Sequence, residues 1–279
     1  MPHTPVDAPD ADITIQSSDG VKFHLHRKNL ESHTGSFPGA DVPTHGETTH
    51  LPERAKVLEV LFQFVYPRRH PISLRELEFA TLMEVAEAAE KYEVWYAVKP
   101  YEDCLISHLP ERAPDIMAHA IKHDIPDLIG KASQYIALQP SAELLKKLPT
   151  HLAVPMVEYQ TTLRDSIFGA ATRYIEALPY EGFYGSYCNK LTKGTCSADI
   201  CGSCRVTLLA WIARLEKSGS IVVLRAALKT PVFDEKHQQG RELCSNCREN
   251  NCQNLPAIVK IVEDAIEGAR PLSDFLQTK

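Results

Sequence analysis

The 279-residue sequence predicts a protein of the α+β class, in which a small sheet with a helical cluster comes first and an all-α region follows. Apolar and polar residues alternate strictly in residues 13–25, which is typical of half-buried strands. Beyond them, apolar residues recur mainly at the three- and four-residue spacing of amphipathic helices. The apolar content of 44% is enough to bury a substantial core.

The first two strands are expected to form a hairpin around the turn sequence SSDG at residues 17–20. Before the turn, Ile13 and Ile15 point to one face, and after it Phe23 and Leu25 do the same. Gly20 suits a turn position that needs a positive φ angle. The hairpin should therefore bury one face against the helices that follow.

Helices are expected over most of the remaining chain. The first starts near residue 26, and the others cover 57–65, 73–92, 95–109, three short segments within 111–148, 152–178, 205–217, 220–228 and 256–269. Ser73 and Glu76 have the spacing of a capping box. Pro100 should interrupt its helix, and Pro155 should lie in a first turn or cause a kink. Residues 179–200 are rich in Gly, Tyr, Ser and Cys, which predicts an ordered loop.

Composition and charge argue against several classes of function. The formal net charge of -6 argues against nonspecific nucleic-acid binding, which needs a basic surface. No apolar run approaches the roughly 18 residues needed to cross a bilayer, and residues 1–11 predict a disordered tail rather than a secretory signal. We therefore expect an address in the cytoplasm or nucleus, where clustered cysteines are more often metal ligands than disulfides.

Seven of the eight cysteines follow residue 187, and four of them form two C-x-x-C pairs. The pairs are Cys201 with Cys204 and Cys244 with Cys247. A C-x-x-C turn brings two thiolates to one tetrahedral ion, and two such turns complete a structural zinc site with Zn–S distances of about 2.3 Å. Such a site keeps no position open for water, so the zinc would not be catalytic.

Other interpretations of the cysteines stay open. Further donors that could replace a ligand or build a second site are Cys188, Cys196, Cys252 and His237. Alternatively, Cys201 and Cys204 form a redox pair, because a helix N-terminus lowers a thiol pKa. A third interpretation is that the thiols are unliganded, or form disulfides under isolation conditions. Cys104, in an apolar helix, is expected to be a small core residue.

His119 and His123 are four residues apart on one expected helix. That spacing could grip a metal ion, but no third ligand stands near them in the sequence. We therefore expect a surface or half-buried pair with no ligand role.

Several motifs follow one another in a recognisable order between residues 12 and 109. They are DITI at 12–15, SSDGVKFHLHR at 17–27, LPE at 51–53, LFQFVYP at 61–67 and AAEKYEV at 88–94. This series resembles a BTB/POZ domain, and the helices of 110–178 resemble, by position and helical content, the BACK region that often continues it. The whole chain resembles the BTB proteins of basidiomycete fungi. The expected organisation is a tail at 1–11, a BTB/POZ domain at 12–109, a BACK-like extension at 110–178 and a cysteine-containing helical region at 179–279.

The resemblance implies a non-enzymatic protein–protein interaction module. Many such domains self-associate, and many recruit a cullin-type ubiquitin ligase scaffold, which implies a role as adaptor or scaffold. No catalytic residue, nucleic-acid partner or membrane partner is expected. Two alternatives remain: a thiol redox protein that uses Cys201 and Cys204, and a zinc-containing transcriptional regulator.

Overall fold

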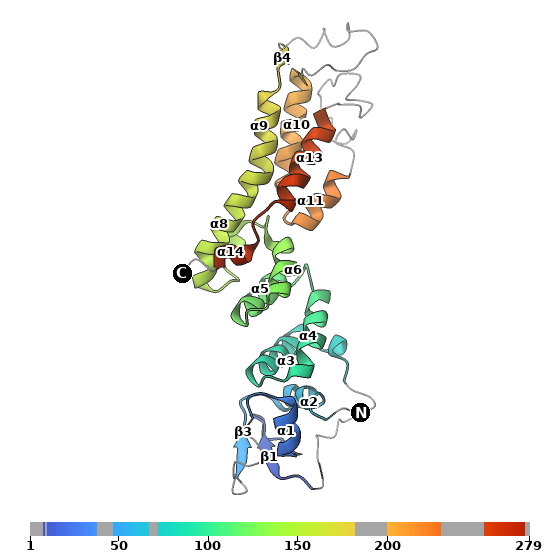
Figure 1. Cartoon of the computed structure of the whole chain (residues 1–279), viewed down its shortest axis with the longest axis vertical. Coiled ribbons are helices and arrows are strands. Elements are labelled where there is room, and N and C mark those ends of the chain that lie inside the picture. The colour runs from blue at the N-terminus through green and yellow to red at the C-terminus, as the bar shows by residue number, and fades with distance from the viewer. Residues whose placement is uncertain are drawn as a thin grey trace. The chain divides into compact units, whose positions relative to one another are not determined.

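The computed structural model describes residues 8, 10–37, 47–66, 72–181, 200–229 and 254–276, without the side chains of 180, 181 and 200–203. The chain divides into two compact units, Met1–Arg112 and Ala113–Lys279 (Figure 1). The regions expected at 110–178 and 179–279 fall almost entirely in the second unit. The described residues form a small three-stranded sheet and a majority of helices, which is compatible with the predicted α+β class. None of the described helices is long and apolar enough to cross a membrane.

The first unit begins with the predicted hairpin. Strands β1 (Ile13–Gln16) and β2 (Lys22–Leu25) pair antiparallel, and Gly20 in the turn has a φ of +86°. Strand β3 (Thr48–His50) pairs parallel with β1, so the strand order is β2-β1-β3. The hairpin prediction is confirmed in its register.

Five helical segments complete the described part of this unit. They are α1 (Arg27–His33), α2 (Ala55–Phe62), the 3₁₀ turn η1 (Leu74–Glu76), α3 (Phe79–Lys91) and α4 (Trp95–Ser107). The predicted capping box is wrong: Ser73 makes no side-chain cap, and extended backbone at Leu77 and Glu78 separates η1 from α3. The predicted interruption at Pro100 is also wrong: α4 continues through this proline, which has no N–H to donate to the carbonyl one turn earlier.

The core of the first unit lies between the sheet and α2, which are drawn close together in Figure 1. Phe23 on β2 is 1% exposed and packs edge-to-face against Phe62, with 5.3 Å between ring centroids. Ile15 and Leu25 from the sheet and Leu61 from α2 are also fully buried. The apolar face that the alternation predicted is therefore the face that is buried.

The second unit is built mainly of helices. In chain order its elements are α5 (Ala113–Lys122), α6 (Pro126–Ile136), α7 (Ser141–Leu144), the 3₁₀ turn η2 (Thr150–Leu152), α8 (Ala153–Arg164), the π-helical turn η3 (Asp165–Gly169), α9 (Ala170–Ala177), β4 (Tyr180–Glu181), β5 (Ile200–Cys201), α10 (Gly202–Leu215), α11 (Ile221–Leu228), α13 (Asn254–Glu267) and α14 (Leu272–Leu276). In Figure 1, α8, η3 and α9 form one rod, with α10 and α13 beside α9. The helix predicted at 152–178 is confirmed, with Pro155 in its first turn.

The C-terminal region is not entirely α-helical, which corrects the prediction. Strands β4 and β5 pair in parallel over two residues each. They lie at the two ends of the stretch predicted as a loop, and the pairing brings those ends together. Residues 182–199 between them lie outside the described residues.

Two polar side chains of α8, the buried Gln160 and the half-buried Arg164, connect the helices around it. The Gln160 side chain accepts a hydrogen bond from Ser141 at 2.7 Å and donates one to the Ile136 carbonyl at 2.9 Å. Arg164 donates to the Leu138 carbonyl at 2.6 Å. The two side chains satisfy carbonyls at the end of α6, which a helix end leaves without intrahelical partners. Arg164 is therefore a structural residue.

We predict that Phe23→Ala lowers the free energy of unfolding of the first unit by about 3–5 kcal/mol, because a buried aromatic ring is lost and a cavity remains beside Phe62. Lys22→Ala is the control, since Lys22 is exposed on the opposite face and such changes usually stay within about 0.5 kcal/mol. Chemical denaturation of both variants measures the effect. Equal midpoints for Phe23→Ala and the wild type would contradict the packing.

Candidate functional site

The corner where α3 turns into α4 exposes two large aromatic side chains. Trp95 is 54% exposed and Tyr96 is 64% exposed. The half-buried ring of His33, at the end of α1, lies 5.7 Å from the Tyr96 ring. We call these three residues the aromatic corner.

The backbone beneath the aromatic corner is fixed by contacts with the end of α1. Thr34 forms a β-bridge with Val94, which is completely buried. Gly35 donates from its backbone N–H to the carbonyl of Glu93 at 3.2 Å. A Cβ atom on Gly35 would meet the Glu93 side chain, so a substitution there requires that exposed side chain to move. Glu93 itself has a φ of +52°, the left-handed conformation that reverses the chain between the helices.

A buried tyrosine anchors the same corner. The Tyr92 hydroxyl donates to Oε2 of Glu53 at 2.6 Å, and Nζ of Lys91 lies 2.8 Å from Oε1 of the same carboxylate. The Phe37 ring stacks on the Tyr92 ring with centroids 5.0 Å apart. The turn from α3 to α4 is therefore held by an ion pair, a charged hydrogen bond and a ring stack at one point.

Both ends of the Tyr92–Glu53 hydrogen bond have shifted pKa values. Burial, helped by the hydrogen bond to Glu53, raises the pKa of Tyr92 to about 12. Partial burial raises the pKa of Glu53, but the hydrogen bonds from Lys91 and Tyr92 outweigh it, so that pKa is lowered overall. At neutral pH the pair is therefore a phenol that donates to a carboxylate, which is a structural contact and not an acid–base couple.

The helix expected at 95–109 exposes this aromatic pair, which sequence reasoning did not single out. A signal was present in the spacing of the apolar residues. The buried side chains of α4 are Ala97, Tyr101, Cys104 and Leu105. They follow the i, i+4, i+7, i+8 spacing of one helix face, and neither Trp95 nor Tyr96 belongs to that stripe.

A chain of three polar side chains joins the predicted N-terminal tail to the start of α1. Nε2 of His26 lies 2.9 Å from Oδ1 of Asp10, and Nδ1 lies 3.0 Å from the Tyr66 hydroxyl. Burial raises the pKa of Tyr66, so its hydroxyl stays protonated at neutral pH and is not a nucleophile. The chain therefore attaches the residues before the hairpin to the domain. Sequence reasoning missed it because the three residues lie far apart in the sequence.

The predicted zinc ligands are only partly within the described residues. Cys204 lies in the first turn of α10 and is 2% exposed. Cys201 ends β5 directly before that helix, and its side chain is not described. Cys244 and Cys247 lie outside the described residues, as do the alternative donors Cys188, Cys196, Cys252 and His237. The four-cysteine site stays a prediction.

Cys104 was expected to be a small core residue, and it is buried on α4. Burial raises the pKa of its thiol, which keeps it protonated and unreactive at neutral pH. That prediction is confirmed.

No protein-family model matches the chain, and no curated protein matches it in sequence. The BTB/POZ resemblance therefore stays a prediction from motifs.

We predict that Tyr92→Phe destabilises the first unit by about 1.5–3 kcal/mol near neutral pH, because a hydrogen bond to a carboxylate is lost. The folded state raises the pKa of Tyr92 from 10.0 to about 12, so it holds the phenolic proton more tightly than the unfolded chain does. This stabilisation is complete below pH 10 and is lost as the pH rises through about 12.

Denaturation at several pH values tests this. The difference between wild type and Tyr92→Phe should narrow between pH 10 and pH 12, whereas Tyr96→Phe, which removes an exposed hydroxyl, should follow the wild type throughout. Parallel profiles for wild type and Tyr92→Phe would show that the Glu53 bond does not perturb this phenol.

For the cysteines, we predict that protein purified without chelator contains zinc, and that Cys204→Ser lowers its zinc content by about one ion per chain. Cys104→Ser, a buried thiol outside the cysteine cluster, is the matched control and should keep the zinc. Metal analysis of the soluble proteins measures this. A zinc-free wild type, or equal zinc in both variants, would refute the four-cysteine site.

Proposed function

We propose that this protein is a non-enzymatic interaction module whose aromatic corner binds a protein partner. The observation that carries the proposal is the exposure of Trp95 and Tyr96 on a backbone fixed by buried contacts. Tryptophan and tyrosine are the residue types most enriched among those that dominate binding energy at interfaces. The partner expected here is a polypeptide that places apolar side chains against these rings.

The fixed backbone supports this proposal energetically. Binding costs less when the contact residues are already ordered in the free protein. The bridge between Thr34 and Val94 and the bond between Tyr92 and Glu53 hold the start of α4 in place. Trp95 and Tyr96 have only two side-chain torsions each, so little further entropy is lost when a partner covers them.

The motif series suggests the class of module. We propose that residues 12–109 form a BTB/POZ domain and that the chain is an adaptor or scaffold for a ubiquitin ligase or a regulatory complex. A cullin-type scaffold and a second copy of the chain are the partners that this resemblance implies. The hairpin, the sheet with order β2-β1-β3 and the helices around it are compatible with that proposal.

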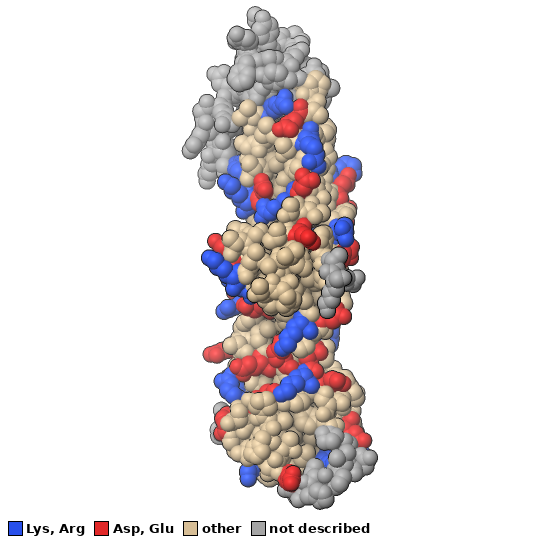
Figure 2. Space-filling view, turned by 90° about the vertical axis from the view of Figure 1, so that its left-hand side faces the viewer, with Lys and Arg blue, Asp and Glu red and all other residues tan. Residues whose placement is uncertain are grey.

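The two alternatives have less support. A catalytic thiol needs access to its substrate, whereas Cys204, half of the proposed redox pair with Cys201, is buried. A transcriptional regulator needs a basic surface for nucleic acid. The net charge is -6, and on the face drawn in Figure 2 basic and acidic side chains are interspersed.

The aromatic corner is tested by capture of partners from native lysate with quantitative mass spectrometry. We predict that Trp95→Ala and Tyr96→Ala each reduce recovery of reproducible partners about 30-fold, which corresponds to the 2 kcal/mol of a residue that dominates binding. Val154→Ala is the matched control, because Val154 is an equally exposed apolar residue in the second unit. Thermal melting should show that all three variants are folded. Equal recovery with all variants would contradict the proposed surface.

A further inference from the structure

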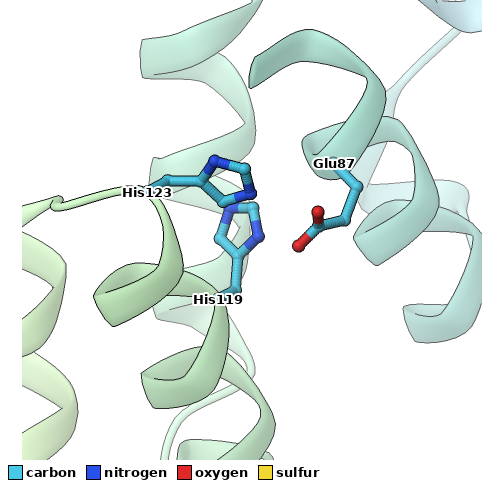
Figure 3. A group of neighbouring side chains, drawn as sticks. All are labelled: Glu87, His119 and His123. Carbon is cyan, nitrogen blue, oxygen red and sulfur yellow. The ribbon is translucent and has the colours of Figure 1, made fainter. Parts of the chain in front are cut away.

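We propose that His119 and His123 bind a divalent transition-metal ion at the C-terminal end of α5. The proposal concerns the second unit alone and goes beyond the interaction function. Figure 3 shows the two side chains, which project from successive turns of the chain at the end of α5. Glu87, the third residue drawn there, lies on α3 of the first unit.

The geometry of the two imidazoles suits a shared ion. Residues four apart on a helix project to the same side. The rings of His119 and His123 lie 4.7 Å apart between centroids, and each offers a ring nitrogen within 4.8 Å of the other. Two nitrogens bound to one tetrahedral ion at about 2.0–2.1 Å are about 3.4 Å apart, a separation that small side-chain rotations provide.

The position of the pair on the helix favours a cation. α5 ends at Lys122, and the backbone N–H of His123 donates to the His119 carbonyl at 3.1 Å, so the second histidine belongs to the last turn. Asp124 follows with a φ of +52° and ends the helix. The partial negative charge at a helix C-terminus stabilises positive charge there.

The difference in burial gives the two ligands different roles. His119 is 2% exposed, which corrects the expectation of a surface or half-buried pair, whereas His123 is half-buried. A buried imidazole loses little side-chain freedom when it binds an ion, and a half-buried one can be reached from solvent. Imidazole suits Zn²⁺, Ni²⁺ and Cu²⁺, and two imidazoles leave the other positions of the ion to water or further ligands. The bound ion would hold the end of α5, which packs against α6.

Equilibrium dialysis of the full chain against Ni²⁺, without a histidine tag, tests the site. The wild type is expected to bind one ion more than His123→Ala, or to bind that ion at least about tenfold more tightly. The reason is that loss of even a group that only orients a metal ligand commonly lowers the metal affinity about 10–100-fold. The control is His151→Ala, an exposed histidine in η2 of the same unit, which should bind as the wild type does. Cysteine ligands are unchanged in all three proteins, so they do not affect the difference.

Thermal unfolding gives a second measurement. When Ni²⁺ is present at a hundred times its dissociation constant, binding to the folded state lowers the equilibrium constant of unfolding about 100-fold. Ni²⁺ should therefore raise the melting temperature of the wild type and of His151→Ala, but not that of His123→Ala. His123 is half-buried, so this variant should fold, which circular dichroism without metal checks. His119→Gln, at the buried position, should repeat the loss wherever it folds. Equal ion content, equal affinity and equal melting shifts in His123→Ala and the wild type would overturn the proposal.

Discussion

The first unit depends on a burial constraint at Tyr92. Its ring is buried, so its hydroxyl needs a partner, and leaving such a group unsatisfied costs about 1–3 kcal/mol. Glu53 supplies that partner from a segment 39 residues earlier. The Glu53 carbonyl also accepts from the backbone N–H of Ser18 in the hairpin turn, while Asp19 of that turn accepts from the N–H of Ala55 at the start of α2. The segment around Glu53 therefore connects the hairpin, α2 and α3, and the orientation of α4 depends on these contacts.

The sequence predicted the elements whose signals are local. Alternation around SSDG identified the hairpin and its buried face, because both strands lie within 13 residues and the side-chain period of two leaves one consistent register. Helical periodicity placed the helices for the same reason. The prediction of a helix cap failed because the partner of a helix start can lie far away in the sequence. The backbone N–H of Ala55 at the start of α2 donates to Asp19, whereas Ser73, which has the right local spacing, makes no cap. Pairing of β3 with β1 is likewise a contact between distant segments.

The candidate sites were predictable to different degrees. The spacing of Cys201 and Cys204 shows that two thiols can share an ion, but spacing does not show whether a second pair meets them. For His119 and His123 the chelating spacing is visible in the sequence, whereas the burial of the first ring and the helix end beside the second are known only from the structure. The aromatic corner could have been found from the buried stripe of α4, because an apolar residue outside a core stripe is an exposed apolar residue.

Adjoining exposed aromatic side chains are candidates for a partner surface, because contiguous exposed apolar area often marks interaction sites. The stripe that includes Ala97 and Tyr101 secures α4 to its unit, and Trp95 and Tyr96 lie outside that stripe. The groups beneath the pair are held in place: Thr34 bridges to Val94, and Tyr92 has its hydroxyl bound by Glu53. A rigid support under exposed rings is the arrangement expected of a binding surface, since rigidity lowers the entropy lost on association while the rings supply the buried area.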